Sequence, residues 1–125
     1  MENFKIPATK YTLEVNLNAA AGTLEMFGSS YPENAIDFFQ PIFDWIKMYL
    51  AESPPKVVLN LKINYLNTSS AKCILDILET LEQYYKEKNR DVSVNWYYAK
   101  EDEDILEMGE EIAEDIEMPF NLLSF

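Results

Sequence analysis

Residues 57–81 read VVLNLKINYLNTSSAKCILDILETL, and within them one periodicity replaces another. Up to residue 65, apolar side chains alternate with a second set, which is the period of a β-strand; that second set is Val58, Asn60, Lys62 and Asn64. From residue 71, apolar side chains recur every three or four positions, which is the spacing of a helix face; they are Ile74, Ile77, Leu78, Leu81 and Tyr85. The stretch therefore predicts a strand at 57–65 and a helix at 71–89.

The junction between these two elements is a cluster of hydroxyl side chains, Thr68, Ser69 and Ser70, preceded by Asn67. The first turn of a helix leaves about four backbone N–H groups unpaired, and the helix dipole adds positive charge there. A Thr or Ser at this point can act as the N-cap, for which we expect Ser69 or Ser70. It can also carry a phosphate with roughly −1.5 to −2 charges. The residues alone leave two interpretations open, a simple cap and a phosphorylation switch.

The same two periodicities predict the other elements outward from the junction. On the N-terminal side we expect a hairpin of strands 11–17 and 23–28, joined by a turn at Ala21 and Gly22. A helix at 33–50 should follow, and Pro41 should kink it or break its first turns. The apolar face of that helix is expected to be Ile36, Phe39, Phe43, Ile46 and Leu50. On the C-terminal side we expect a strand at 92–98, a final strand at 120–125 and, between them, a helical stripe of Ile105, Met108, Ile112 and Ile116.

The resulting order is strand, strand, helix, strand, helix, strand, helix, strand. Strands that alternate with helices after an opening hairpin predict parallel crossovers and an α/β fold with a mixed sheet. Many positions that face away from the apolar set are polar, so we expect the helices mainly on one face of the sheet. These positions are Thr12, Glu14, Asn16, Asn60, Lys62, Asn64, Ser93 and Asn95. Asn60, Lys62 and Asn64 should be substantially exposed.

Composition narrows the class of protein. A chain of 125 residues with 48% hydrophobic residues suits a single domain over residues 1–125. Its formal net charge of −12 would repel nucleic acid. Cys73 is the only cysteine, residues 1–10 contain no apolar signal segment, and no apolar run approaches the roughly 18 residues of a membrane span. We therefore expect a cytoplasmic protein without membrane insertion.

Two further groups of residues are candidates for partner binding. The segment 101–117, which begins with Glu101 and Asp102, contains ten carboxylates and no basic residue. It fits a solvated helix face whose first acidic residues match the helix dipole, and it equally fits an electrostatic docking face for a basic partner. Tyr97 should lie on the polar face of its strand and could anchor a partner, whereas Trp96 and Tyr98 should join the core.

Catalysis has little support in the sequence. The chain has no histidine and no GxxxxGK[ST] loop, and the acidic segment lacks the spacing of a calcium loop, so we expect no cofactor and no metal site. One alternative is a small hydrolase that uses Thr68 or Ser70 as nucleophile and Lys72 as base. Another is a constitutive acidic assembly subunit whose hydroxyl groups only cap the helix.

Six blocks of the sequence resemble a known family in the family's own order. They are YTLEV at 11–15, SYPENA at 30–35, FQP at 39–41, NTSSAKC at 67–73, VNWYY at 94–98 and EDED at 101–104. The element order, with a hydroxyl at the junction of the third strand and second helix, resembles the STAS domain of anti-sigma-factor antagonists. The blocks are more closely similar to the SiaC family of regulatory phosphoproteins, and the resemblance spans nearly the whole chain.

This resemblance implies a regulatory role in bacterial biofilm signalling. The phosphorylated threonine of the family matches Thr68 here. The family's partners would be a dedicated kinase, a phosphatase of the PP2C type, and a diguanylate cyclase that the unmodified form binds and activates. Classical STAS antagonists place a serine before a glycine at this turn, whereas Ala71 and Lys72 follow Ser70 here, so Ser69 and Ser70 stay open as alternative acceptors. The expected partner-binding residues are Asn67, Thr68, Ser69, Ser70, Lys72, Tyr97, Glu101 and Asp102.

Overall fold

The computed structural model describes residues 1–125 and contains six strands and three helices. The strands are β1 (Phe4–Ile6), β2 (Glu14–Asn18), β3 (Thr23–Ser30), β4 (Lys56–Leu66), β5 (Asp91–Tyr98) and β6 (Phe120–Ser124). The helices are α1 (Ala35–Ala51), α2 (Thr68–Lys88) and α3 (Glu103–Asp115). None of the helices has the length and hydrophobicity needed to cross a membrane.

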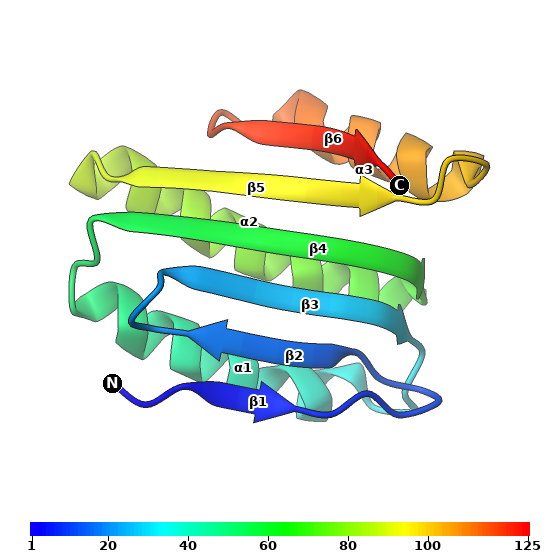
Figure 1. Cartoon of the computed structure of the whole chain (residues 1–125), viewed down its shortest axis with the longest axis horizontal. Helices are drawn as coiled ribbons and strands as arrows, with labels where there is room; N and C mark the ends of the chain where they lie inside the picture. Colours follow the sequence, from blue (N-terminus) through cyan, green and yellow to red (C-terminus); the bar gives the residue numbers. More distant parts are fainter.

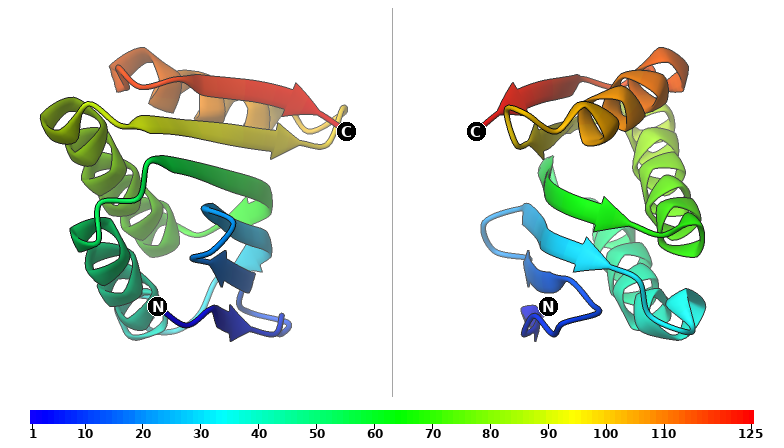
Figure 2. Two further views of the ribbon diagram at one scale, coloured as in Figure 1. Left: turned by 60° about the vertical axis from the view of Figure 1, so that its left-hand side comes forward. Right: turned by 90° about the vertical axis from the view of Figure 1, so that its right-hand side faces the viewer.

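The six strands form one sheet in the order β1-β2-β3-β4-β5-β6, with the helices gathered behind it (Figures 1 and 2). The first three strands pair antiparallel, whereas β3 to β6 pair parallel through the crossover helices α1, α2 and α3. This arrangement confirms the predicted α/β class with a mixed sheet. Strand β1 was not predicted, because three residues are too few to show a period.

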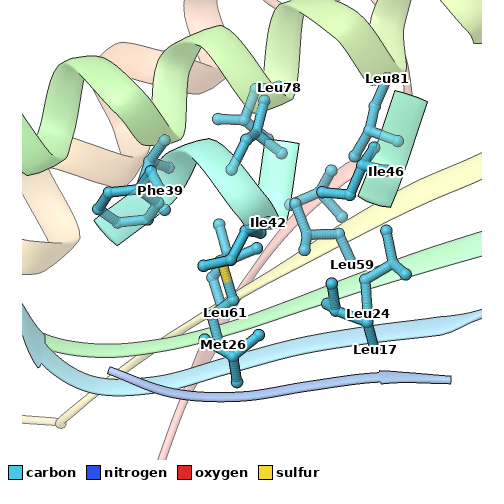
Figure 3. Packing of buried hydrophobic residues seen from close by; sticks show 14 of the residues in the cluster. Leu17, Leu24, Met26, Phe39, Ile42, Ile46, Leu59, Leu61, Leu78 and Leu81 are labelled. Carbon is cyan, nitrogen blue, oxygen red and sulfur yellow. The ribbon is translucent and has the colours of Figure 1, made fainter. Parts of the chain in front are cut away.

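The core lies between the sheet and α1 and α2 (Figure 3). Leu17, Leu24 and Leu59 are paired across β2, β3 and β4 and are fully buried. Ile42 and Ile46 of α1, with Leu78 and Leu81 of α2, pack over them. Each such side chain contributes about 1.5–3 kcal/mol by leaving water. This packing fixes both helices, and with them the start of α2.

Helix α1 differs from the prediction in two ways. It begins at Ala35, with Asn34 as N-cap, and continues without a break through Pro41 to Ala51, so the expected break at Pro41 is wrong. A proline inside a helix costs about 3 kcal/mol, but Phe39 and Ile42 on either side are buried, and their packing holds the helix in place. The predicted face was also imprecise, because Ile36 is exposed.

The end of β4 contains an irregularity that sequence alternation did not predict. Gly28 of β3 pairs with Ile63, but the next residue, Ser29, pairs with Tyr65, so β4 has one extra residue there. A bulge of this kind reverses the side-chain alternation beyond it. As a result Tyr65 is 53% exposed, and Leu66 takes its place in the core.

The face of the sheet without helices carries a row of polar side chains across all six strands. Consecutive register pairs connect them, and from β1 to β6 they are Lys5, Asn16, Glu25, Asn60, Asn95 and Asn121. Asn60 donates to Glu25 Oε2 (3.2 Å), Asn95 donates to Asn60 Oδ1 (2.9 Å) and Asn121 donates to Asn95 Oδ1 (3.0 Å). Lys62 and Asn64 are exposed, as predicted, whereas these amide contacts leave Asn60 half-buried.

Helix α3 lies close against the sheet at Gly109. A Cβ atom added there would stand 2.6 Å from Trp96 Cδ1 and 2.8 Å from Leu122 Cδ2. We expect Gly109→Val to lower the free energy of unfolding by about 1–3 kcal/mol, because the buried Trp96 ring has no room to move away. Urea unfolding measures the change. Glu110→Val, at the exposed neighbouring position, is the control and should cost only about 0.5 kcal/mol; equal losses in the two variants would contradict this account of the contact.

Candidate functional site

The hydroxyl cluster forms the first turn of α2, where β4 passes into the helix. Asn67 is the N-cap, and its Oδ1 accepts from the Ser70 N–H at 2.9 Å. The expectation that Ser69 or Ser70 caps the helix is therefore wrong. Asn and Ser have similar cap preferences, so the sequence did not distinguish between them. Asn67 leaves the three hydroxyl groups free of the capping role.

Ser70 has a structural position of its own. Its side chain is fully buried, and its Oγ lies 2.8 Å from Oγ of Ser30, at the end of β3. The backbone N–H of Asn67 also donates to the Ser30 carbonyl at 2.9 Å. These two contacts connect the start of α2 to the end of β3. Because Asn67 and Ser70 stand on either side of Thr68, these contacts hold the backbone at Thr68 against the end of β3.

Thr68 and Ser69 differ from Ser70 because both are exposed. They occupy the first two positions of α2, where unpaired N–H groups and the helix dipole favour negative charge. Lys72 is also exposed and follows Thr68 by four residues, so it lies one turn further along on the same side. An anion attached to Thr68 would therefore meet both the helix end and a lysine side chain.

A groove between α1 and α2 begins beside this turn. Its volume is about 500 Å³, and its lining combines apolar, basic and acidic side chains: Ile36, Phe39, Gln40, Phe43 and Lys47 from α1, and Ser69, Lys72, Cys73 and Asp76 from α2. Ile36 is 66% exposed, which is unusual for an isoleucine. Ser69 and Lys72 thus belong both to the first turn of α2 and to the groove.

Cys73 lines this groove as a half-buried thiol. Burial is the larger cause that raises its pKa, and the nearby Asp76 carboxylate raises it further, while Lys72 acts in the opposite direction. A raised pKa leaves less thiolate at a given pH. We therefore expect iodoacetamide at pH 8 to alkylate Cys73 several-fold more slowly in the folded chain than in the same chain unfolded in urea, as followed by intact mass. Faster alkylation of the folded chain would contradict this expectation.

Three tyrosines beside the junction form a cluster that sequence reasoning missed. Tyr11 and Tyr31 meet edge to face at 5.3 Å between ring centroids, and Tyr31 meets Tyr65 in the same manner at 5.9 Å. All three are exposed, and Tyr31 directly follows Ser30. Because they come from three separate segments, and because the bulge in β4 turns Tyr65 outward, no local pattern in the sequence signals them.

The remaining predicted site residues lie at the same end of the sheet but are not gathered around Thr68. Tyr97 is half-buried on the open face, opposite the helices, and pairs with Lys62 in the register. Glu101 is exposed in the connection between β5 and α3. Asp102 is the N-cap of α3 and accepts from the Ile105 N–H at 3.1 Å, so it has a structural role.

The acidic segment is largely a solvent-facing helix surface. Only Glu117 of its ten carboxylates forms a salt bridge, with Lys86 of α2 at 2.8 Å, and this hydrogen bond raises the pKa of Lys86. Glu103 and Asp104 lie in the first turn of α3, where negative charge is favoured. Their placement agrees with the helix-dipole interpretation and leaves the rest of the face free to attract basic groups.

The sequence and the fold both have relatives among known proteins. Residues 6–125 match the family model described as SiaC family regulatory phosphoprotein. An uncharacterized protein of Pseudomonas aeruginosa (strain UCBPP-PA14) is 39% identical over 120 residues, which cover 96% of this chain and 94% of the relative. SiaC of Pseudomonas aeruginosa is similar over 100% of both chains, with a TM-score of 0.93 and 37% identity. A similar chain is also present in the crystal structure of the diguanylate cyclase SiaD in complex with its activator SiaC, with a TM-score of 0.92, 38% identity and 98% and 99% coverage.

Proposed function

The chain belongs to the SiaC family of regulatory phosphoproteins, and from this membership we propose that it is a partner-switching protein controlled by phosphorylation of Thr68. A dedicated kinase adds the phosphate, and a PP2C-type phosphatase removes it. The unmodified form binds and activates a diguanylate cyclase, the class of enzyme that accompanies SiaC in the related complex. In this proposal residues 1–125 act as one STAS-like domain in the cytoplasm and catalyse no reaction themselves.

The observation that carries the proposal is the exposure of Thr68 at the first position of α2, beside the groove. A kinase needs an accessible hydroxyl group, which Thr68 and Ser69 both offer. Ser70 fits poorly as the acceptor, because its side chain is fully buried against Ser30. Thr68 is preferred over Ser69 because it matches the phosphorylated threonine of the family.

The surface that we assign to the partner consists of Thr68, Ser69 and Lys72 with the adjoining groove and the three tyrosines. Exposed aromatic and apolar side chains at a pocket are typical of the energetically important centre of an interface. Asn67 positions this surface as the N-cap of α2, and Ser70 positions it through its buried contact with Ser30. Tyr97, Glu101 and Asp102 lie outside it, and in this proposal they contribute at its margin or to a different contact.

Phosphate at Thr68 should leave the domain folded. The helix end favours a negative charge by about 0.3–2 kcal/mol, and Lys72 lies one turn away to pair with it. The effect of the phosphate is therefore expected at the interface and not in the core.

The assignment of the acceptor can be tested by co-expression with the candidate kinase. Thr68→Ala should abolish phosphorylation, whereas the matched variant Ser69→Ala should still gain the mass of one phosphate. Intact mass gives the yield, and peptide mass spectrometry locates the modified residue. A phosphate on none of Thr68, Ser69 and Ser70 would contradict the switch and would favour a constitutive assembly subunit.

A further inference from the structure

The outer edge of β6 presents main-chain groups that no strand of the sheet pairs. Phe125 N–H donates to the Tyr98 carbonyl at 3.0 Å, and the Phe125 carbonyl accepts from Lys100 N–H at 3.1 Å. Residue 125 therefore faces β5 with both of its main-chain groups. Because a strand alternates with period two, the outward-facing N–H and C=O groups belong to Phe120, Leu122 and Ser124.

This edge lacks the features that usually protect an edge strand. At the other edge, β1 has only three residues, carries Lys5 and is followed by Pro7. In contrast, residues 120–125 read FNLLSF, with no charged side chain and no proline. Leu123 is 38% exposed, and Phe125 is 49% exposed with its ring turned over the open face, 4.2 Å from Lys62 Nζ. An open, apolar edge of this kind is a template for an additional strand.

The row of amides on the open face ends at this same edge with an acceptor free. Asn60, Asn95 and Asn121 each donate toward β3, and the Oδ1 atoms of Asn60 and Asn95 each accept from the next asparagine on the side of β6. For Asn121, which is exposed, no strand of this chain lies on that side. A side-chain donor on an added strand, at the position paired with Asn121, would continue the row.

The charge of α3 indicates the chemistry of that strand. Met108, Glu111 and Ile112 line a cavity shared with α2, so the opposite flank of α3 lies toward the free edge of β6 (Figure 2). At 100° per residue this flank includes half-buried Leu106 and exposed Glu103 and Glu110. An added strand would thus have an apolar side chain near Leu106 and carboxylates within reach of its longer residues.

We propose that the free edge of β6 binds an extended, lysine- or arginine-containing segment of a partner protein as a seventh strand. Main-chain hydrogen bonds to Leu122 and Ser124 would hold the segment, and its basic side chains would pair with Glu103 and Glu110. A second copy of this chain fits less well, because joining two β6 edges would bring two acidic α3 helices together. This surface is separate from Thr68, so the binding would not depend on its phosphorylation.

The test uses the full chain and a capped ten-residue peptide, TKTVTKTVTK, in which one face of the strand alternates lysine with valine, to meet α3, and the other face carries threonine, whose hydroxyl groups are the donors for Asn121. A control peptide of the same sequence has every backbone amide N-methylated, which keeps its charge and removes all of its N–H donors. We expect NMR shifts at Leu122 and Ser124 with the first peptide, and binding at least tenfold weaker with the second. Ser124→Pro removes one outward N–H group and should weaken binding at least tenfold, whereas Ser124→Ala, which keeps it, should stay within twofold.

Each other outcome overturns the proposal. Equal binding of the methylated peptide would mean charge attraction alone, and shifts confined to other strands would place the peptide elsewhere. A dimer of the wild-type chain that Ser124→Pro dissociates, measured by sedimentation, would assign the edge to a second copy. If Ser124→Pro does not fold, the methylated peptide still tests the same hydrogen bonds on the wild-type chain.

Discussion

A chain that carries phosphate on Thr68 should bind the diguanylate cyclase at least about a hundredfold more weakly than the unmodified chain. The phosphate brings roughly −1.5 to −2 charges to a surface shaped for a hydroxyl group. Burying that charge costs several kcal/mol unless the cyclase supplies Arg or Lys, and each 1.4 kcal/mol is about a tenfold change in affinity. The phosphate would also draw Lys72 toward itself, away from the groove. Titration calorimetry of both forms against the same cyclase measures the difference.

Three substitutions test whether a negative charge weakens cyclase binding only at position 68 or anywhere on α2. Thr68→Ala should keep cyclase affinity, and Thr68→Glu should weaken it with little change in melting temperature. Thr80→Glu adds the same charge to the same helix about three turns further along and should leave affinity unchanged. Equal affinities of the phosphorylated and unmodified chains would remove the switch, and a comparable loss in Thr80→Glu would show that general repulsion is responsible.

Trp96→Ala should lower the free energy of unfolding by about 3–5 kcal/mol, the largest stability effect that we expect from one substitution. Trp96 is fully buried, and its ring stacks on Phe120 at 6.2 Å between centroids. Its Nε1 donates to the Ile105 carbonyl at 3.0 Å and so fastens α3 to β5. The substitution leaves a cavity and removes this hydrogen bond between β5 and α3. Because domains are stable by only about 5–15 kcal/mol, urea unfolding should show a large shift of the midpoint.

The adjacent residue provides the control for this prediction. Tyr97 is an aromatic side chain on the same strand, but it lies half-buried on the opposite face. Tyr97→Ala should cost about 1 kcal/mol or less. Trp96→Phe, which keeps most of the volume, should fall between the two alanine variants. A loss for Trp96→Ala no larger than that for Tyr97→Ala would contradict the proposed attachment of α3.

Much of the fold could be predicted because its signals are local. The strand and helix within residues 57–81 each show their own period, and the hydroxyl cluster lies at the junction where the periods predict it. The features that were missed depend on distant pairings. Ser30 and Ser70, which form the buried contact, are 40 residues apart, and the bulge that exposes Tyr65 is visible only when β3 and β4 are paired.

In the candidate site, too, the features with local signals were predicted, and those that depend on distant contacts were not. That Thr68 stands at a helix start follows from the pattern around it, but its exposure depends on Asn67 taking the cap and on Ser70 turning inward. The groove and the tyrosine cluster need α1, α2 and three separate segments to meet. Sequence reasoning therefore located the hydroxyl groups, and only the folded chain distinguishes the one that is buried from the two that are accessible.

The contacts of Ser30 with Ser70 and Asn67 have a consequence for how a cell would use this protein. Under the proposed switch, we expect these contacts to hold the start of α2 to β3 in both phosphorylation states, so that the kinase, the phosphatase and the cyclase would each meet the same backbone shape. Partners that occupy the same small surface exclude one another. The activity of the cyclase would then depend on the concentration of unmodified chains that are not bound to the kinase or the phosphatase.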